Sequence, residues 1–284
     1  MNTATKEQIK ADLANYVAKV GSQMGASKRL QGVSNGTISN ILASKWANIS
    51  DEMWFSIQKQ VKISGWMHSD TSLSGFMSFL YKDVMLYSEV RCVISPSDTG
   101  KTHSAKRHVS DNENAFLVSC DECMTKRDFL EAILSAMGKT ADGKTTRKLL
   151  NAVIENLLKT EHPQIIFDEF DKVRDEIFLF LISFYNATED KASLIIQGTP
   201  YLKKRIIDGV KNGKKGFVEV FTRINSRFVE PPQNEQDELK EIARINGVDD
   251  EEELIRITND ADGSIRRIKS STKVYLRRPK NQAA

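Results

Sequence analysis

The sequence contains few cysteines and no long apolar run, and each shortage excludes a class of protein. Three cysteines in 284 residues are too few for a disulfide framework. Cys120 and Cys123 form a CxxC pair, but no second pair exists and the four histidines are scattered, which argues against a zinc site. No apolar run approaches the ~18 residues of a membrane span, and the polar N-terminus is unlike a signal peptide. We therefore expect a cytoplasmic protein that does not engage a membrane.

Proline and glycine are also scarce. Six prolines and 15 glycines leave no room for a long low-complexity segment. The 40% hydrophobic and 28% charged residues are typical of folded soluble domains. Because 284 residues exceed one average domain, we expect two domains, or one large domain with a small appendage.

The net charge is only +3, but charge is segregated along the chain. Residues 1–68 carry a net +4 and residues 263–284 a net +7, whereas residues 235–262 carry a net −8. Lysine and arginine displace condensed counterions from phosphates, so two basic segments suit a polyanion such as DNA. The alternative is that the segregation serves solubility and pairing between domains.

Residues 1–64 are predicted to form short helices, because no strand pattern occurs there. Residues 6–20 have apolar side chains at helical spacing. Two further helices flank a glycine-containing turn at residues 31–36, with Ser34 as the N-cap of the second. This arrangement resembles the helix-turn-helix of the lambda-repressor class. The residues expected to face the core are Val33, Ile38, Ile41 and Leu42. Those expected to face DNA are Ser34, Asn35, Thr37 and Asn40. The alternative is a protein-docking helical domain.

The remaining chain is predicted to be α/β, followed by a helical segment. Residues 65–88 are interpreted as a linker and a connecting helix that starts near Phe76. Over 89–232, four short apolar runs alternate with helical patterns, which predicts a parallel sheet with helices on both faces and ligands at the strand carboxyl ends. The expected strands are 90–94, 115–120, 164–167 and 193–197. Residues 233–284 are predicted to form a small α-helical lid.

The first expected strand runs into a phosphate-binding loop. Such a loop needs backbone N–H groups and a helix N-terminus around the phosphates, a lysine for the β- and γ-phosphates and a hydroxyl for Mg²⁺. The segment is Ser95, Pro96, Ser97, Asp98, Thr99, Gly100, Lys101 and Thr102. Against the pattern GPPGTGKT it departs at Ser95, Ser97 and Asp98. Asp98 adds negative charge near a triphosphate, which is compatible with weak or slow turnover.

The third expected strand supplies the complementary half of an ATPase site. It ends in Asp168 and Glu169, which we predict hold Mg²⁺ and polarise the attacking water, respectively. Gln197 or Thr199, at the end of the fourth strand, could fill a polar sensor position. Together the two motifs predict binding of ATP with Mg²⁺.

Three arginines are candidates for contacts with the phosphates. Arg223 and Arg227 are four residues apart, which predicts one helical face and an arginine finger directed into a neighbouring subunit's site. Arg266, in the segment GSIRRI, begins the last expected helix and resembles the sensor 2 arginine of a lid. An arginine taken alone is more often a surface salt-bridge partner, and it is the ordered series of motifs that favours a role in the site.

These features, in this order along the chain, resemble the AAA+ regulators of DNA transposition, the group of phage Mu B and of the Tn7-like elements. The resemblance covers nearly the whole chain and is most distinctive in VEVFTRINSR and in the joining of this N-terminal domain to this ATPase. It implies an ATPase that assembles as a helical homo-oligomer on double-stranded DNA, selects target DNA and recruits and activates a transposase. It also implies Lys101, Thr102 and Asp168 at the nucleotide, Glu169 as the base, Arg223 or Arg227 as the finger and Arg266 as sensor 2.

In a filament of this type, DNA lies against loops of the ATPase core. The corresponding residues here are Lys126, Arg127, Lys144, Thr145 and Arg147. The alternative is that they form an ordinary solvated helix start and turn. Two other functions compete with the first: a helicase-loader or replication-initiation ATPase, and a nucleotide-gated DNA-binding repressor.

Overall fold

The computed structural model describes residues 3–64, 66 and 69–277 and divides the chain into two compact units, 1–68 and 69–284. The basic residues Arg278 and Lys280 lie outside the described residues. Within the described part of the chain no helix combines the length and apolarity that a membrane span requires.

The N-terminal unit is helical, as predicted. Its elements are α1 (Thr3–Val20), α2 (Gln23–Arg29), α3 (Asn35–Leu42) and α4 (Asp51–Ser64). Ser34 caps α3 by accepting a hydrogen bond from the Thr37 amide at 3.1 Å. Ile38, Ile41 and Trp54 are fully buried in a core that belongs to this unit. The expected division of α3 into a buried and an exposed side is therefore present.

The second unit begins with α5 (Ser72–Leu86), four residues earlier than the sequence suggested. Thr71 and Ser74 form a reciprocal capping box at its N-terminus, so residues that the sequence analysis interpreted as linker start the helix. Leu73, Met77 and Val84 are buried against the sheet. Helix α5 is thus part of the packed α/β layer and does more than connect two domains.

A five-stranded parallel sheet forms the centre of this unit, with the strand order β2-β3-β4-β1-β5. The strands are β1 (Val90–Ile94), β2 (Ala115–Ser119), β3 (Gln164–Asp168), β4 (Ser193–Gly198) and β5 (Phe228–Val229). The sequence predicted the first four. The fifth was missed, because two residues are too short to show a periodicity.

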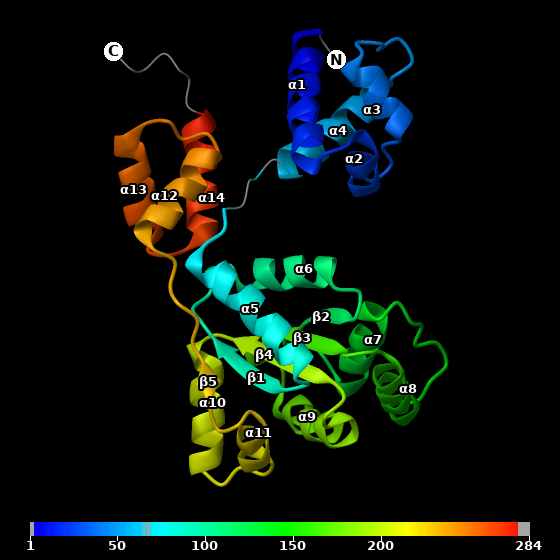
Figure 1. Cartoon of the computed structure of the whole chain (residues 1–284), viewed down its shortest axis with the longest axis vertical. Helices are drawn as coiled ribbons and strands as arrows, with labels where there is room; N and C mark the ends of the chain where they lie inside the picture. The colour runs from blue at the N-terminus through cyan, green and yellow to red at the C-terminus, as the bar shows by residue number, and fades with distance from the viewer. Residues whose placement is uncertain (1–2, 65, 67–68, 278–284) are drawn as a thin grey trace. The chain divides into compact units, whose positions relative to one another are not determined.

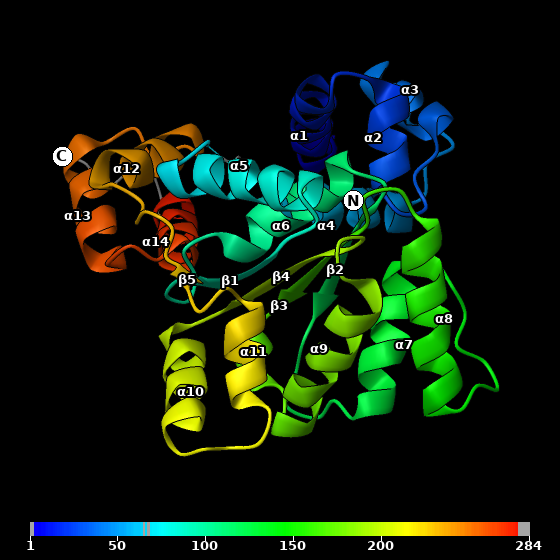
Figure 2. The same ribbon diagram turned by 60° about the horizontal axis from the view of Figure 1, so that its bottom comes forward.

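Helices cover both faces of the sheet (Figures 1 and 2). Helices α5 and α6 (Lys101–Asp111) pack on one face with a small hydrophobic core. The other face packs against a second and larger hydrophobic core. The helices over that larger core are α7 (Lys126–Ala136), α8 (Thr146–Lys159), α9 (Asp175–Thr188), α10 (Pro200–Lys211) and α11 (Phe217–Arg223). Alternate residues of the central strands serve the two faces: Ile165 and Phe167 pack into the larger core, and Ile166 packs under α5.

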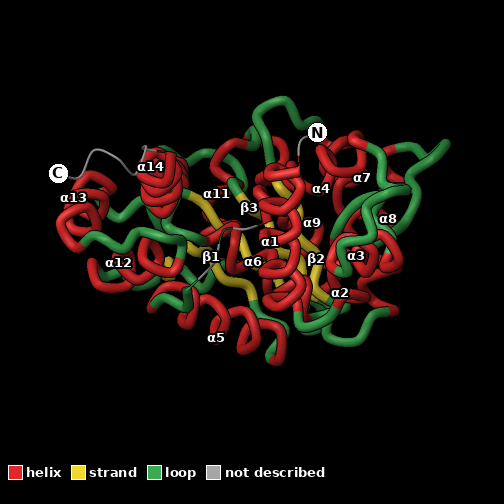
Figure 3. Tube along the Cα trace, turned by 90° about the horizontal axis from the view of Figure 1, so that it is seen from above, coloured by secondary structure: helices red, strands yellow, loops and turns green. Residues whose placement is uncertain are grey.

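The chain ends in the predicted helical lid. Helices α12 (Gln236–Ile245), α13 (Glu251–Ala261) and α14 (Ile265–Arg277) pack on one another and lie together in Figures 1 and 3. Their many acidic residues are largely used locally: Arg244 pairs with Glu241 and Glu251, each at 3.1 Å. The lid meets the core at α5, where Glu238 accepts hydrogen bonds from the Ser72 amide and hydroxyl.

Candidate nucleotide-binding site

The strand order brings the predicted phosphate-binding loop and the acidic strand end together. Strand β4 lies between β1 and β3, so residue 197 at its end is a neighbour of both. Val93 pairs with Gln197 across β1 and β4, and Phe167 pairs with Ile196 across β3 and β4. The loop that follows β1, Asp168 and Gln197 therefore meet at one edge of the sheet, where α/β folds bind ligands.

Two left-handed residues shape the loop. Asp98 has φ 64° and Gly100, the N-cap of α6, has φ 111°. A Cβ on Gly100 would lie 3.2 Å from the Ile265 Cδ1 atom of the lid, so both conformation and space favour glycine there. Inside the loop, the Ser95 and Thr99 hydroxyls lie 3.0 Å apart in a hydrogen bond.

Lys101 lies inside this loop. Its Nζ atom donates to the carbonyl oxygens of Ser95 at 2.7 Å and Pro96 at 2.6 Å, and the residue is only 8% exposed. Burial lowers the pKa of Lys101, while the carboxylates of Asp168 and Asp171 act in the opposite direction. The loop carbonyls thus hold the lysine that sequence analysis assigns to the β- and γ-phosphates.

Thr102 and Asp168 are in direct contact. The Thr102 Oγ1 atom donates to Asp168 Oδ2 at 2.6 Å, and Asp168 is 2% exposed. Among the described residues no three His, Cys, Asp or Glu side chains gather as a metal cage. A hydroxyl beside a carboxylate nevertheless suits Mg²⁺, which is usually held by one or two protein oxygens together with substrate phosphates and water. These two residues fit the predicted cofactor.

Glu169 occupies the position after this carboxylate in a left-handed conformation, with φ 54°. Its amide donates to Asp168 Oδ1 at 3.0 Å. The Glu169 side chain is half-exposed and paired with Lys172 at 2.8 Å. Its role as the base is a prediction from the sequence.

The two candidates for the sensor position have different partners. Gln197 is fully buried and donates through Nε2 to Asp168 Oδ1 at 2.9 Å. Thr199 donates instead to Asp171 Oδ2 at 2.7 Å. Of the two, Gln197 is the residue in contact with Asp168, the carboxylate predicted to hold Mg²⁺.

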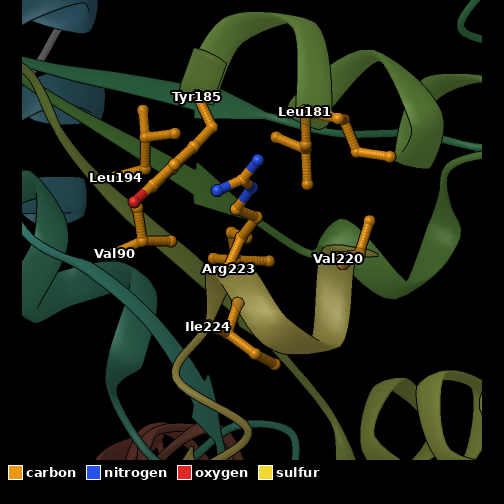
Figure 4. A pocket seen from close by; sticks show the side chains of 9 residues that line it. Val90, Leu181, Tyr185, Leu194, Val220, Arg223 and Ile224 are labelled. Atoms are coloured by element: carbon orange, nitrogen blue, oxygen red, sulfur yellow. The ribbon is translucent and has the colours of Figure 1, made fainter. Parts of the chain in front are cut away.

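Arg223, at the end of α11, is held by α9 of its own subunit. Its guanidinium lies 4.5 Å from the centre of the Tyr185 ring and donates to Asn186 Oδ1 at 2.8 Å. Figure 4 shows the side chain directed toward Tyr185 and Leu181 in an apolar slot that Val90 and Ile224 also line.

The expectation that Arg223 and Arg227 share a helical face is wrong. Helix α11 ends at Arg223, because Asn225 and Ser226 have positive φ of 57° and 52° and turn the chain toward β5. Arg227 is exposed, and no hydrogen bond or ion pair of its guanidinium is seen within the described residues.

The third candidate, Arg266, contacts the phosphate-binding loop from the lid. Its guanidinium pairs with Asp98 Oδ1 at 3.0 Å and is 80% exposed. The Asp98 carbonyl accepts the Ile265 amide at 2.9 Å, so both parts of Asp98 hold the start of α14. Asn234, two residues before α12, donates to the Thr99 carbonyl at 2.9 Å. No motif of the sequence pointed to Asn234.

The predicted DNA-binding residues of the N-terminal unit lie on the exposed side of α3. Ser34, Asn35 and Asn40 are exposed and Thr37 is half-buried. Ser34 is occupied as the cap and also lies 2.9 Å from the Thr37 hydroxyl. Asn35 and Asn40 are therefore the two predicted DNA-binding residues whose side chains take no part in capping α3.

The two core loops predicted to contact DNA meet each other. Arg127, in the first turn of α7, donates to the Lys144 carbonyl at 2.7 Å, and Thr145 caps α8. Lys126 and Arg127 each pair with a carboxylate. Arg147 is exposed. The structure therefore gathers the five residues at the N-termini of two neighbouring helices.

A second residue that contacts the site, Tyr81, was also missed by the sequence analysis. Tyr81 of α5 is fully buried and donates to Gln197 Oε1 at 2.9 Å. In the sequence it is one more apolar position of an amphipathic helix, and only the packing of α5 on the sheet reveals its contact.

Comparison with known protein families gives a match that includes the phosphate-binding loop and the end of β3. Residues 88–206 match the family described as AAA domain. The chain therefore contains an AAA-type domain, which generally uses ATP and Mg²⁺, and this supports a nucleotide-hydrolysing ATPase. No curated protein matches the chain.

Proposed function

We propose that this protein is an ATP-dependent DNA-binding ATPase of DNA transposition. In this proposal it assembles as a helical homo-oligomer on double-stranded DNA, selects the target and recruits and activates a transposase. The observation that carries the ATPase part is the contact between Thr102 and Asp168 beside Lys101. The DNA part is supported by the exposed side of α3 and by the basic helix ends of the core, and the transposase part by the sequence resemblance.

In this proposal each residue of the site has a separate role in phosphoryl transfer. Thr102 and Asp168 would hold Mg²⁺, which neutralises charge on the phosphates when bound. Lys101 would exchange its bonds with the carbonyls of Ser95 and Pro96 for the phosphates. Glu169 would leave Lys172 and orient the attacking water. Phosphoryl transfer depends mainly on such positioning and charge stabilisation.

Two substitutions test these roles. Lys101→Ala should abolish ATP binding and with it any filament on DNA. Glu169→Gln should bind ATP normally but turn it over slowly, so that filaments persist longer. Nucleotide binding is measured by titration calorimetry and filaments by electron microscopy. Turnover at the wild-type rate in Glu169→Gln would show that Glu169 is not the base.

We propose Arg227, rather than Arg223, as the arginine that completes a neighbouring subunit's site. Arg223 is bound to Tyr185 and Asn186, and breaking those contacts would cost free energy, whereas Arg227 is exposed and unpaired within the described residues. An arginine delivered in trans stabilises the charge of the transferring phosphoryl group.

Mixing experiments test the choice. Arg227→Ala and Lys101→Ala, each inactive alone, should recover turnover when mixed, because one interface then pairs an intact loop with an intact arginine. Arg223→Ala serves as the comparison and should retain most activity alone. Recovery with Arg223→Ala only would reverse the assignment, and turnover per subunit that ignores protein concentration would refute action in trans.

The proposed DNA contacts have a salt-dependence test. Each phosphate neutralised adds about 0.9 to the slope of log affinity against log salt. Removal of residues 1–64 should weaken binding to duplex DNA and flatten that slope. An unchanged slope would favour protein docking as the role of this unit.

Assembly is tested by electron microscopy with duplex DNA of mixed sequence. We expect filaments with ATP and their loss with ADP. Tight binding at a single sequence without filaments would favour a nucleotide-gated repressor. Binding to a replicative helicase without filaments would favour a helicase loader.

A further inference from the structure

A buried chain of hydrogen bonds links α5 to the carboxylate at the proposed Mg²⁺ site. The Tyr81 hydroxyl donates to Gln197 Oε1 at 2.9 Å, and Gln197 Nε2 donates to Asp168 Oδ1 at 2.9 Å. Thr102 donates to the other oxygen of Asp168 at 2.6 Å. Tyr81 and Gln197 are completely buried and Asp168 is 2% exposed, so water does not compete for these bonds.

The orientation of the Gln197 amide in this series of hydrogen bonds follows from which groups donate and which accept. An ionised carboxylate only accepts, so Asp168 requires the NH₂ end of the Gln197 amide. The oxygen end then faces away and needs a donor, which the Tyr81 hydroxyl provides. Burial, followed by the Asp168 charge, raises the pKa of Tyr81, so the hydroxyl keeps its proton throughout the range in which the protein works.

The position of Tyr81 is itself fixed by its surroundings. Its carbonyl accepts a hydrogen bond from Gln164 Nε2 at 2.9 Å, which ties α5 to the first residue of β3. Its ring centre lies 5.0 Å from that of His108 on α6. The hydroxyl is therefore presented to Gln197 by contacts to two neighbouring elements.

We propose that Tyr81 is a positioning residue of the ATPase site: through Gln197 it holds Asp168 in the orientation in which that carboxylate and Thr102 receive Mg²⁺. The inference rests on the proposed ATPase function. It also extends the catalytic unit beyond the AAA match, which begins at residue 88. Helix α5 then supplies part of the active site.

Loss of the hydroxyl has a specific consequence for the metal site. Without Tyr81 as donor, Gln197 Oε1 is buried without a partner, and the amide must move to find one. Asp168 Oδ1 then loses a fixed donor, while Lys101 and the rest of the phosphate-binding loop are unchanged. Removing a group that orients a metal ligand typically costs 10–100-fold in metal affinity or activity.

Tyr81→Phe in the full chain tests the proposal. We expect turnover to fall roughly 10-fold and the Mg²⁺ concentration for half-maximal turnover to rise by a similar factor. Binding of ADP with the metal chelated should be unchanged. The matched control is Tyr87→Phe, which removes a hydroxyl from an exposed side chain at the end of the same helix and should alter neither quantity.

A double-mutant comparison separates positioning from a general effect on folding. If Tyr81 acts only through Gln197, Tyr81→Phe should add nothing to Gln197→Leu, in turnover or in Mg²⁺ dependence. The same comparison applies if Tyr81→Phe alone does not fold, because the double variant leaves neither buried polar group unpaired. A further loss in the double variant, or a single variant with wild-type Mg²⁺ dependence, would overturn the inference. Absence of turnover in the wild-type protein would instead refute the ATPase function.

Discussion

The same chemical change, glycine to alanine in a helix, should have different effects on stability at two positions of the ATPase unit. In the interior of a helix, alanine is favoured over glycine by about 1 kcal/mol. Gly75 in α5 has open space where a Cβ would be added, so Gly75→Ala should raise the free energy of unfolding by about that amount. Gly209 in α10 has no such space.

A Cβ on Gly209 would lie 2.2 Å from a carbon of the Phe217 ring. Phe217 is 1% exposed and stacks on Phe178, with ring centres 5.5 Å apart, so it has nowhere to move. Overpacking of this kind costs about 1–3 kcal/mol. Gly209→Ala should therefore be less stable than Gly75→Ala by about 1–3 kcal/mol, because the helix-propensity gain is common to both and cancels.

Thermal unfolding followed by circular dichroism measures this difference. For a domain of this size, 1 kcal/mol shifts Tm by about 2–4 °C. The three tryptophans are Trp46, Trp54 and Trp66, so tryptophan fluorescence reports on residues 1–68 and serves as the internal control. A Gly209→Ala protein as stable as Gly75→Ala would show that Phe217 can yield, and the packing argument would fail.

Three further outcomes are expected. Asp98→Gly should tighten ATP binding several-fold, because it removes a carboxylate from the phosphate-binding loop and releases Arg266 from its ion pair. Titration calorimetry measures the affinity, and an unchanged value would contradict this expectation. Burial lowers the pKa of His108, so below pH about 6.5 the unfolded chain binds a proton that the folded chain does not. The free energy of unfolding, measured by urea titration, should therefore fall from pH 7 to pH 5. His108→Gln should make this pH dependence weaker and leave the part due to His103, whose pKa burial also lowers. An identical pH dependence in His108→Gln would refute this assignment. Arg147→Ala should lower the salt slope of DNA binding by about one, equally for all sequences, and a slope that stays constant would remove Arg147 from the interface.

Local patterns predicted the first four strands and the phosphate-binding loop, because their signals lie within a few residues. The run from Gln164 to Asp168 combines apolar residues with a terminal carboxylate, and the segment ending in Lys101 and Thr102 carries its own motif. These features depend on backbone geometry and caps, which the local sequence controls.

What the sequence could not predict depends on contacts between distant segments. Tyr81 and Gln197 are 116 residues apart, and their hydrogen bond exists only once α5 lies on the sheet. Helical spacing placed Arg227 on the face of Arg223, but the positive φ of Asn225 and Ser226 ends the helix. Both residues adopt the left-handed region at a modest cost that local patterns do not report.

Asp98 binds the lid through both its backbone carbonyl and its side chain, and this affects how the lid can move. Its carbonyl and its carboxylate bind consecutive residues, Ile265 and Arg266, at the origin of a 13-residue helix. A helix of that length spans about 20 Å and behaves as a stiff rod. A rotation of only 10° at the loop would therefore carry the far end of α14 through an arc of about 3 Å. A small adjustment of the phosphate-binding loop would thus become a larger displacement at the far end of α14.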